Sequence, residues 1–123
     1  MVKPTILLVD DEVDFLEGAR MILESGGYPV LTAANAAEAL EAARTHRIGL
    51  AVLDVNLPDG DGYGLCQDLR RETPGADFPI VFLSVRTQMK DILYGIASGA
   101  RDFLTKPIGG SALLHAVGKA LAA

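Results

Sequence analysis

The sequence predicts an α/β fold, a doubly wound parallel sheet of five strands flanked by five helices. Five short apolar runs alternate along the chain with segments whose apolar residues recur every three or four positions. Strict alternation of this kind is typical of parallel sheets, because right-handed crossovers place the connecting helices on both faces. The chain has 123 residues, half of them hydrophobic, which suits a single domain over residues 1–123 with its own core.

The five strands are expected where short apolar runs break off at polar residues. Such a run is typical of a strand that is buried on both faces. In chain order, the expected strands are residues 5–9, 30–33, 50–53, 79–83 and 102–105. After the third strand, residues 56–62 are expected to form a loop, because they contain Pro58 and two glycines.

A segment with helical spacing follows each expected strand. The first helix, over 12–25, is expected to stop at Gly26-Gly27, and the fourth, over 89–98, at a left-handed Gly99. Asn35 and Glu38 have the spacing of a capping box before the second helix. The third helix is expected over 63–72. In three of the helices the apolar residues share one face: Val13, Leu16, Ala19 and Leu23 in the first, Ala39, Leu40 and Ala43 in the second, and Leu113, Leu114, Val117 and Leu121 in the fifth.

Charge and composition narrow the function classes. Sixteen acidic and eleven basic residues give a net charge of −5, which argues against direct binding to nucleic acid or to an anionic membrane surface. The apolar runs are far shorter than the ~20 residues needed to cross a bilayer. Cys66 is the single cysteine and no secretory leader precedes the first strand, so we expect a cytoplasmic protein without an internal disulfide.

Polar side chains follow four of the five expected strands. In an open α/β sheet the functional crevice lies beyond the carboxyl ends of the strands. If the first, third, fourth and fifth strands are neighbours, three carboxylates, a hydroxyl and an ammonium meet there. These side chains belong to Asp10, Asp11, Asp54, Ser84 and Lys106.

This set of groups suits phosphoryl transfer. Gathered carboxylates repel one another, and protonation or a divalent cation relieves the repulsion. An oxygen-rich site favours Mg²⁺, which takes one or two carboxylates together with waters and phosphate oxygens. A carboxylate such as Asp54 can accept a phosphoryl group if the metal and Lys106 neutralise the transition state. Ser84 could then hydrogen-bond the phosphoryl group and change the shape of its loop.

The residues also carry a family resemblance. Four separated motifs occur in order at the strand ends: Asp10-Asp11-Glu12, Asp54-Val55-Asn56-Leu57-Pro58-Asp59-Gly60-Asp61-Gly62, Ser84, and Phe103-Leu104-Thr105-Lys106-Pro107. Together they resemble the receiver domain of two-component response regulators, from Thr5 to Leu121. The resemblance implies a single receiver domain over 1–123, with the flavodoxin-like strand order 2-1-3-4-5.

The resemblance implies a role for each matching residue. Asp54 is expected to be the phosphoacceptor, with Lys106 and Ser84 as the other catalytic residues. The implied metal ligands are Asp11 and Asp54 directly, Asp10 through water, and Asn56 by its backbone carbonyl. Ser84 and Phe103 stand at the switch positions, where the ring turns inward as the hydroxyl moves toward the phosphoryl group.

Three further positions matter for this resemblance. A cis peptide bond is expected between Lys106 and Pro107. Val85 follows Ser84 where the family usually has a small residue, and a larger side chain there could slow hydrolysis of the phosphoryl group. Arg86 adds a positive charge near the rim of the site.

The implied partners are a sensor histidine kinase or phosphotransfer protein on one side and a downstream protein or output domain on the other. We expect a monomer or a weak, phosphorylation-dependent dimer. No turnover of a diffusible substrate is expected, apart from Mg²⁺-dependent self-phosphorylation and autodephosphorylation of Asp54.

Several site residues have alternative structural interpretations. Asp10 or Asp11 alone could cap the first helix, and Asp54 alone could form an Asx-turn. Residues 59–64 suggest a calcium loop, but Tyr63 and Arg70 stand where such a loop needs oxygen ligands. Cys66 has no paired base and is expected to be a small, buried or half-buried side chain.

Two other function classes compete with the signalling switch. A receiver-like protein could work as a phosphorylation-independent binding module, although every acidic site position is filled here. An enzyme on the same fold fits less well. An aspartate-nucleophile phosphatase needs a second aspartate where Asn56 stands. A flavodoxin needs a neutral phosphate loop where Asp10 and Asp11 stand. A dinucleotide-binding site needs a Gly-x-Gly-x-x-Gly turn after the first strand, and this sequence lacks that turn.

Overall fold

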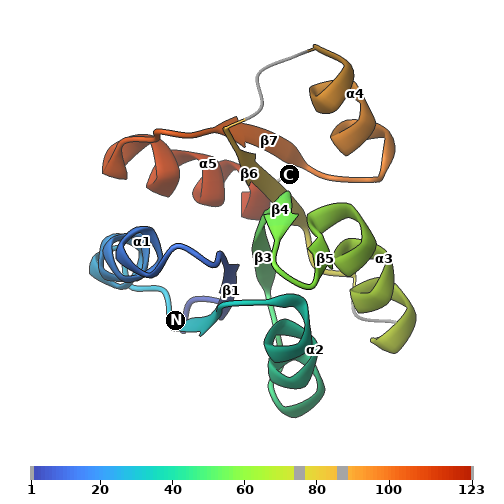
Figure 1. The fold of residues 1–123 in the computed structure, drawn as a ribbon. Coiled ribbons are helices and arrows are strands. Elements are labelled where there is room, and N and C mark those ends of the chain that lie inside the picture. The colour runs from blue at the N-terminus through green and yellow to red at the C-terminus, as the bar shows by residue number, and fades with distance from the viewer. Residues whose placement is uncertain (1, 74–76, 86–88, 123) are drawn as a thin grey trace.

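The fold is an α/β sandwich with a parallel sheet at its centre (Figure 1). The structure is a computed structural model and describes residues 2–73, 77–85 and 89–122. Its elements in chain order are β1 (Ile6–Val9), α1 (Val13–Ser25), β2 (Val30–Ala33), α2 (Ala36–Thr45), β3 (Leu50–Asp54), β4 (Asn56–Leu57), β5 (Gly60–Asp61), α3 (Gly62–Glu72), β6 (Ile80–Ser84), α4 (Met89–Ala97), β7 (Asp102–Thr105) and α5 (Gly110–Ala122).

The main sheet has five strands in the order β2-β1-β3-β6-β7, with every neighbouring pair parallel. In order of position along the chain this is 2-1-3-4-5, so the predicted fold class and strand order are confirmed. Helices α1 and α5 cover one face, and α2, α3 and α4 lie on the other (Figure 1). The carboxyl ends of β1, β3, β6 and β7 therefore lie side by side.

The core has two halves because side chains of a strand point alternately to the two faces of the sheet. In β1, Leu7 and Val9 pack toward α2 and α3, and Ile6 and Leu8 pack toward α1 and α5. All residues of β1, β3 and β6 are buried, as their uninterrupted apolar runs predict. This central block fixes the sheet edge that carries the polar residues.

The helix ends follow local sequence signals. Gly27 (φ +92°) and Gly99 (φ +93°) adopt left-handed backbone after α1 and α4, as expected of glycine at these positions. The Asn35 carbonyl oxygen Oδ1 accepts from the Glu38 amide at 2.8 Å, and Glu38 Oε1 accepts from the Ala34 amide at 2.9 Å. The predicted capping-box pair is thus confirmed. Glu38 accepts from the amide of Ala34, the residue before the N-cap, and not from the amide of Asn35 itself.

Two details differ from the sequence expectation. The loop expected over 56–62 contains a short antiparallel pair, β4 with β5, in which Asn56 opposes Asp61 across the turn at Pro58. Val13, expected on the buried face of α1, is 72% exposed, because the packing of that helix on the core starts further along, at Phe15 and Leu16. Within the described residues the longest helices have 13 residues, and none is long and apolar enough to cross a membrane.

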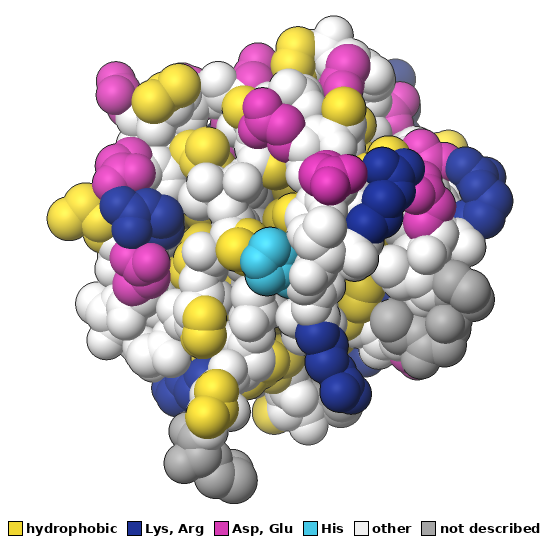
Figure 2. Space-filling view, turned by 90° about the horizontal axis from the view of Figure 1, so that it is seen from below, with side chains coloured by type: hydrophobic (Ala, Val, Ile, Leu, Met, Phe, Trp, Pro, Cys, Tyr) yellow, Lys and Arg dark blue, Asp and Glu magenta, His cyan; other side chains and the backbone are white. Residues whose placement is uncertain are grey.

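Charges of both signs share the surface. On the face shown in Figure 2, Asp and Glu side chains lie beside Lys and Arg side chains, with hydrophobic side chains scattered among them. Ion pairs such as Arg44 with Glu72, at 2.6 Å, join neighbouring helices. The face in Figure 2 therefore carries mixed charge.

Candidate functional site

The candidate site lies at the carboxyl edge of the sheet. Asp10 follows β1, Asp54 is the last residue of β3 and Ser84 the last of β6, and these residues are 1%, 6% and 0% exposed. Because β1, β3 and β6 are neighbours, their ends bring together residues that are 30 to 74 positions apart in the sequence. The structure thus brings the predicted carboxylates and the hydroxyl to one edge.

Lys106, just after β7, joins the two buried carboxylates. Its Nζ donates to Asp10 Oδ2 at 2.5 Å and to Asp54 Oδ2 at 3.2 Å, and Glu12 Oε1 lies 3.9 Å away. The peptide bond between Lys106 and Pro107 is cis, as expected. The ammonium therefore lies directly against one carboxylate oxygen of Asp54, the predicted phosphoacceptor.

The second oxygen of each buried carboxylate is held by local backbone. Asp10 Oδ1 accepts from the Glu12 amide at 2.9 Å, and Asp54 Oδ1 accepts from the Asn56 amide at 3.0 Å. Both are bonds of the Asx-turn type, from an amide two residues further along the chain. The Asx-turn interpretation of Asp54 and the functional one are therefore compatible, because each uses a different oxygen.

Three carboxylates are close enough to share one cation. Oxygens of Asp10, Asp11 and Asp54 lie within 4.8 Å of one another, with Asp11 exposed to solvent. The donors are all oxygen, which suits a hard divalent cation. The backbone carbonyl of Asn56 stays a prediction as a fourth ligand.

Burial and charge shift the pKa values of the two central groups. Burial raises the pKa of Asp54 above its usual value, the Asn56 amide opposes this, and the charge of Asp10 raises the pKa further. Burial alone would lower the pKa of Lys106, but its hydrogen bond to Asp10 and the charges of Asp10 and Asp54 raise the pKa overall. Lys106 therefore stays protonated, and the ionised form of Asp54 is less favoured than that of an ordinary exposed aspartate.

The two predicted switch residues lie on neighbouring strands. Ser84 pairs in register with Thr105, two residues beyond Phe103. The half-buried ring of Phe103 packs toward Phe82, with ring centroids 6.3 Å apart, and against the backbone of Gly95 in α4. A Cβ at Gly95 would lie 2.6 Å from Cδ2 of that ring. Sequence reasoning missed Gly95, although a glycine inside a helix is itself a signal of close packing.

Sequence reasoning also missed Phe15 in the first turn of α1. The Lys106 ammonium lies 4.4 Å from the centroid of the Phe15 ring. Phe15 packs on the same cluster as Ala19 and Leu23, four and eight positions further along α1, but Lys106 is 91 positions away in the sequence. Only the tertiary structure brings the two together.

The acidic residues of the 54–62 motif have separate positions. Asp54 belongs to the site, but Asp59 accepts from the amides of Ala36 and Ala37 at 2.8 and 3.1 Å, at the start of α2. Asp61 accepts from the Gly64 amide at 2.7 Å and caps α3. Both carboxylates thus bind helix N-termini, a role that was not predicted for them from the sequence.

The remaining residues singled out from the sequence lie around the site or far from it. Val85 is 65% exposed, and Arg86 lies outside the described residues. Cys66 is buried in α3, as expected, and burial raises the pKa of its thiol. The thiol is therefore protonated and poorly nucleophilic at neutral pH.

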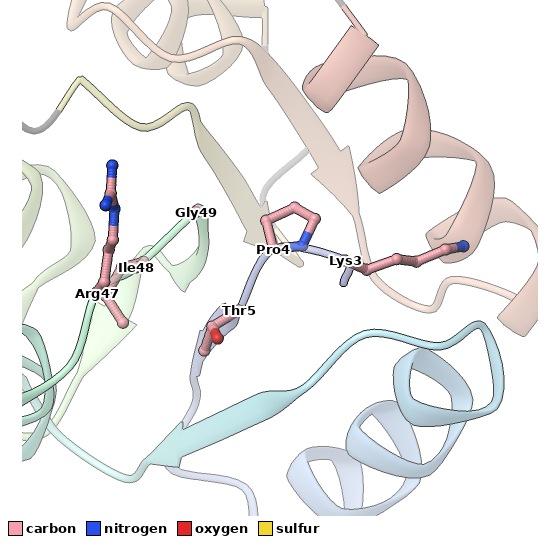
Figure 3. A pocket seen from close by; sticks show the side chains of 6 residues that line it. All are labelled: Lys3, Pro4, Thr5, Arg47, Ile48 and Gly49. Atoms are coloured by element: carbon pink, nitrogen blue, oxygen red, sulfur yellow. The ribbon is translucent and has the colours of Figure 1, made fainter. Parts of the chain in front are cut away.

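A pocket at the opposite edge of the sheet differs from the candidate site because no carboxylate is among the described residues that line it. It is lined by Lys3, Pro4, Thr5, Arg47, Ile48 and Gly49 (Figure 3). The side chains of Lys3 and Arg47 extend in different directions, and Lys3 Nζ donates to the Gly26 carbonyl at 2.7 Å. The polar cluster at the carboxyl edge therefore remains the candidate site.

The chain is similar to known proteins in both sequence and structure. A family model, "Response regulator receiver domain", matches residues 6–118. The chain is 41% identical over 102 residues to "Probable transcriptional regulator ycf27" of Cyanidium caldarium, covering 83% of this chain and 40% of that protein. It is also 41% identical over 102 residues to the "Alkaline phosphatase synthesis transcriptional regulatory protein PhoP" of Bacillus subtilis, covering 83% and 42%. The chain spans less than half the length of these curated relatives.

Solved structures show the same fold. The chemotaxis protein CheY4 of Vibrio cholerae superposes with a TM-score of 0.90 at 30% identity, covering 96% of this chain and 98% of that one. A two-component response regulator from Clostridium difficile gives 0.89 at 30% identity, covering 98% and 97%. With the family model matching most of its length, the chain belongs to the response regulator receiver domains of two-component signalling.

Proposed function

We propose that this domain is a phosphorylation switch that accepts a phosphoryl group on Asp54 in a Mg²⁺-dependent reaction. The observation that carries the proposal is the position of Asp54, whose Oδ2 lies 3.2 Å from the Lys106 ammonium and beside the carboxylates of Asp10 and Asp11. A buried carboxylate with one oxygen fixed by backbone and the other beside a cation is oriented to act as a nucleophile.

The proposed transfer replaces one bond to phosphorus with another. An oxygen of the Asp54 carboxylate forms a bond to phosphorus while the bond between phosphorus and the donor's leaving atom breaks, and the leaving group keeps that electron pair. With a phosphohistidine donor the leaving atom is an imidazole nitrogen. Lys106 lies where it can neutralise charge on the phosphoryl oxygens. Attack by water on the acyl phosphate later releases inorganic phosphate and restores Asp54.

The donor set fits Mg²⁺, because it offers carboxylate oxygens with an exposed side for water and phosphate. The residues that would hold the ion are Asp11 and Asp54 directly, Asp10 through water, and Asn56 through its backbone carbonyl. The metal would supply positive charge that offsets the crowded carboxylates and the phosphoryl oxygens.

Ser84 and Phe103 are the proposed route from the site to the surface. Ser84 would donate its hydroxyl hydrogen to the phosphoryl group, and the backbone of its loop would follow. Phe103 packs against α4 at Gly95, so a movement at the end of β6 can alter the surface formed by α4 and β7. A downstream protein or an output domain would read that surface, and a sensor histidine kinase or phosphotransfer protein would supply the phosphoryl group.

Intact mass after incubation with Mg²⁺ and acetyl phosphate tests the proposal. The wild type is expected to gain one phosphoryl group, and Asp54→Asn and a metal-chelated sample none. Asp68→Asn is the matched control, since Asp68 is a half-exposed acid of α3 paired with Arg71, and it should gain the group as the wild type does. A wild type that stays unmodified, with a histidine kinase as donor too, would favour the phosphorylation-independent binding module.

A further inference from the structure

The ammonium of Lys106 has an uncharged neighbour besides its carboxylate partners. Its Nζ lies 4.4 Å from the centroid of the Phe15 ring, close enough for attraction to the negative face of the ring. The Lys106 side chain is only 11% exposed, so the ring stands where water would otherwise solvate the ammonium. Such contacts strengthen as the cation loses water.

Phe15 itself is anchored by the core. It is half-buried in the first turn of α1 and packs against the buried cluster between the sheet and α1 and α5. The ring therefore has a fixed place, whereas a lysine side chain has four rotatable carbon–carbon bonds and reaches solvent easily. A fixed ring can restrict where that flexible side chain places its charge.

The charged partners of Lys106 cannot hold its ammonium in place at every stage of the phosphoryl transfer. The attraction of Asp10 and Asp54 for the ammonium depends on their negative charge, which a bound divalent cation offsets and which phosphorylation of Asp54 moves onto the phosphoryl oxygens. The attraction of the ring does not depend on those charges. The ring therefore keeps the ammonium near Asp54 while the charges around it change.

We infer that Phe15 is a positioning residue, which holds the Lys106 ammonium at Asp54 and thereby sets the rate at which Asp54 accepts a phosphoryl group. The inference rests on the proposed function of Asp54. It assigns to α1 a part in the chemistry that its sequence pattern does not indicate.

A pair of substitutions separates this role from simple packing. Phe15→Leu keeps an apolar side chain but removes the ring, and Phe15→Tyr keeps the ring face. Tyr28→Leu is the matched control, because Tyr28 packs on the same core cluster and has Lys3 over its ring at 4.7 Å, before β2 at the opposite edge of the sheet.

The rate of phosphorylation by acetyl phosphate with Mg²⁺ is followed by intact mass at several donor concentrations. Phe15→Leu is expected to lower the maximal rate constant by roughly three- to tenfold, with Phe15→Tyr and Tyr28→Leu close to the wild type. Urea unfolding of each variant identifies any loss of folded protein. A Phe15→Leu protein that reacts at the wild-type rate, or a Phe15→Tyr protein as slow as Phe15→Leu, would overturn the inference.

A spectroscopic measurement tests the contact without any chemistry. The ring current of Phe15 should shift the NMR signals of the Lys106 εCH₂ protons, and this shift should disappear in Phe15→Leu and persist in Phe15→Tyr and Tyr28→Leu. Unchanged Lys106 signals in Phe15→Leu would contradict the contact. A wild type with the ring-current shift but no phosphorylation would instead contradict the proposed function.

Discussion

At the scale of the residue, Asp54 illustrates the cost of placing a nucleophilic carboxylate inside a protein. Burial raises its pKa against the effect of the Asn56 amide, and Asp10 raises it further. The folded protein therefore binds more protons than the unfolded chain between the two pKa values of Asp54. The free energy of unfolding falls as pH rises through that window, and the loss is complete above the folded pKa.

Asp54→Asn is accordingly expected to raise the urea midpoint of the metal-free protein at pH 7. The difference should shrink as pH is lowered and vanish below the unfolded pKa of about 4. Asp68→Asn, at a half-exposed position, should show no such trend. A midpoint of Asp54→Asn equal to that of the wild type at pH 7 would contradict this electrostatic account.

The site residues that follow strands were predictable from the sequence, because parallel strands carry their carboxyl ends to one edge. Asp10, Asp54 and Lys106 meet there as expected. The contact of Phe15 with Lys106 was not predictable, because the two residues are 91 positions apart and meet only in the folded protein. No local pattern in the sequence encodes that contact.

At the scale of the element, two glycines in helices have opposite surroundings. A Cβ added at Gly18 of α1 meets open space among the described residues, but one at Gly95 of α4 would lie 2.6 Å from the Phe103 ring. Alanine favours a helix over glycine by about 1 kcal/mol. Filling space that is already occupied costs about 1–3 kcal/mol.

Gly18→Ala is therefore expected to stabilise the protein by about 0.5–1 kcal/mol. Gly95→Ala should instead destabilise it by about 1 kcal/mol and move the aromatic NMR signals of Phe103. Urea unfolding of both variants measures the two effects side by side. Equal stabilisation by both substitutions would show that the Phe103 ring does not need the space at Gly95.

The N-terminus of α2 depends on a residue from another segment. Asp59, in the turn between β4 and β5, accepts from the amides of Ala36 and Ala37, and these bonds lower its pKa. The lowered pKa means that Asp59 stabilises the fold at neutral pH, and this contribution is lost as pH falls through its folded pKa. The sequence identified Asp59 only as part of a motif, since the two segments are 22 positions or more apart.

Asp59→Ala should loosen the start of α2. Hydrogen exchange of the Ala36 and Ala37 amides is expected to become faster, while the Gly64 amide, capped by Asp61 on α3, keeps its rate. Lowering the pH of the wild type through the folded pKa of Asp59 should reduce the protection of the same two amides from exchange. Unchanged protection of Ala36 and Ala37 in Asp59→Ala would show that Asp59 does not stabilise the start of α2.

At the scale of the whole molecule, the alternation of apolar runs and helical segments was enough to predict a parallel sheet with helices on both faces, and the family resemblance supplied the strand order. It could not place α4 in detail, because Met89, Leu93 and Ile96 are apolar yet more than half exposed, and Gly95 is the buried residue of that helix. Hydrophobic spacing predicts that a helix exists, and packing partners decide which of its sides is buried. The same limit explains why Val13 was misplaced.

The fold brings residues 10, 54 and 106 together, and we propose that Asp54 is the residue that accepts the phosphoryl group. The most direct measurement is the position of the phosphoryl group after reaction with acetyl phosphate and Mg²⁺, found by digestion in cold acid and tandem mass spectrometry. We predict a single phosphoryl group on the peptide that contains Asp54, and none in the chelated sample. A phosphoryl group on any other residue, or one that forms equally without the metal, would contradict the account.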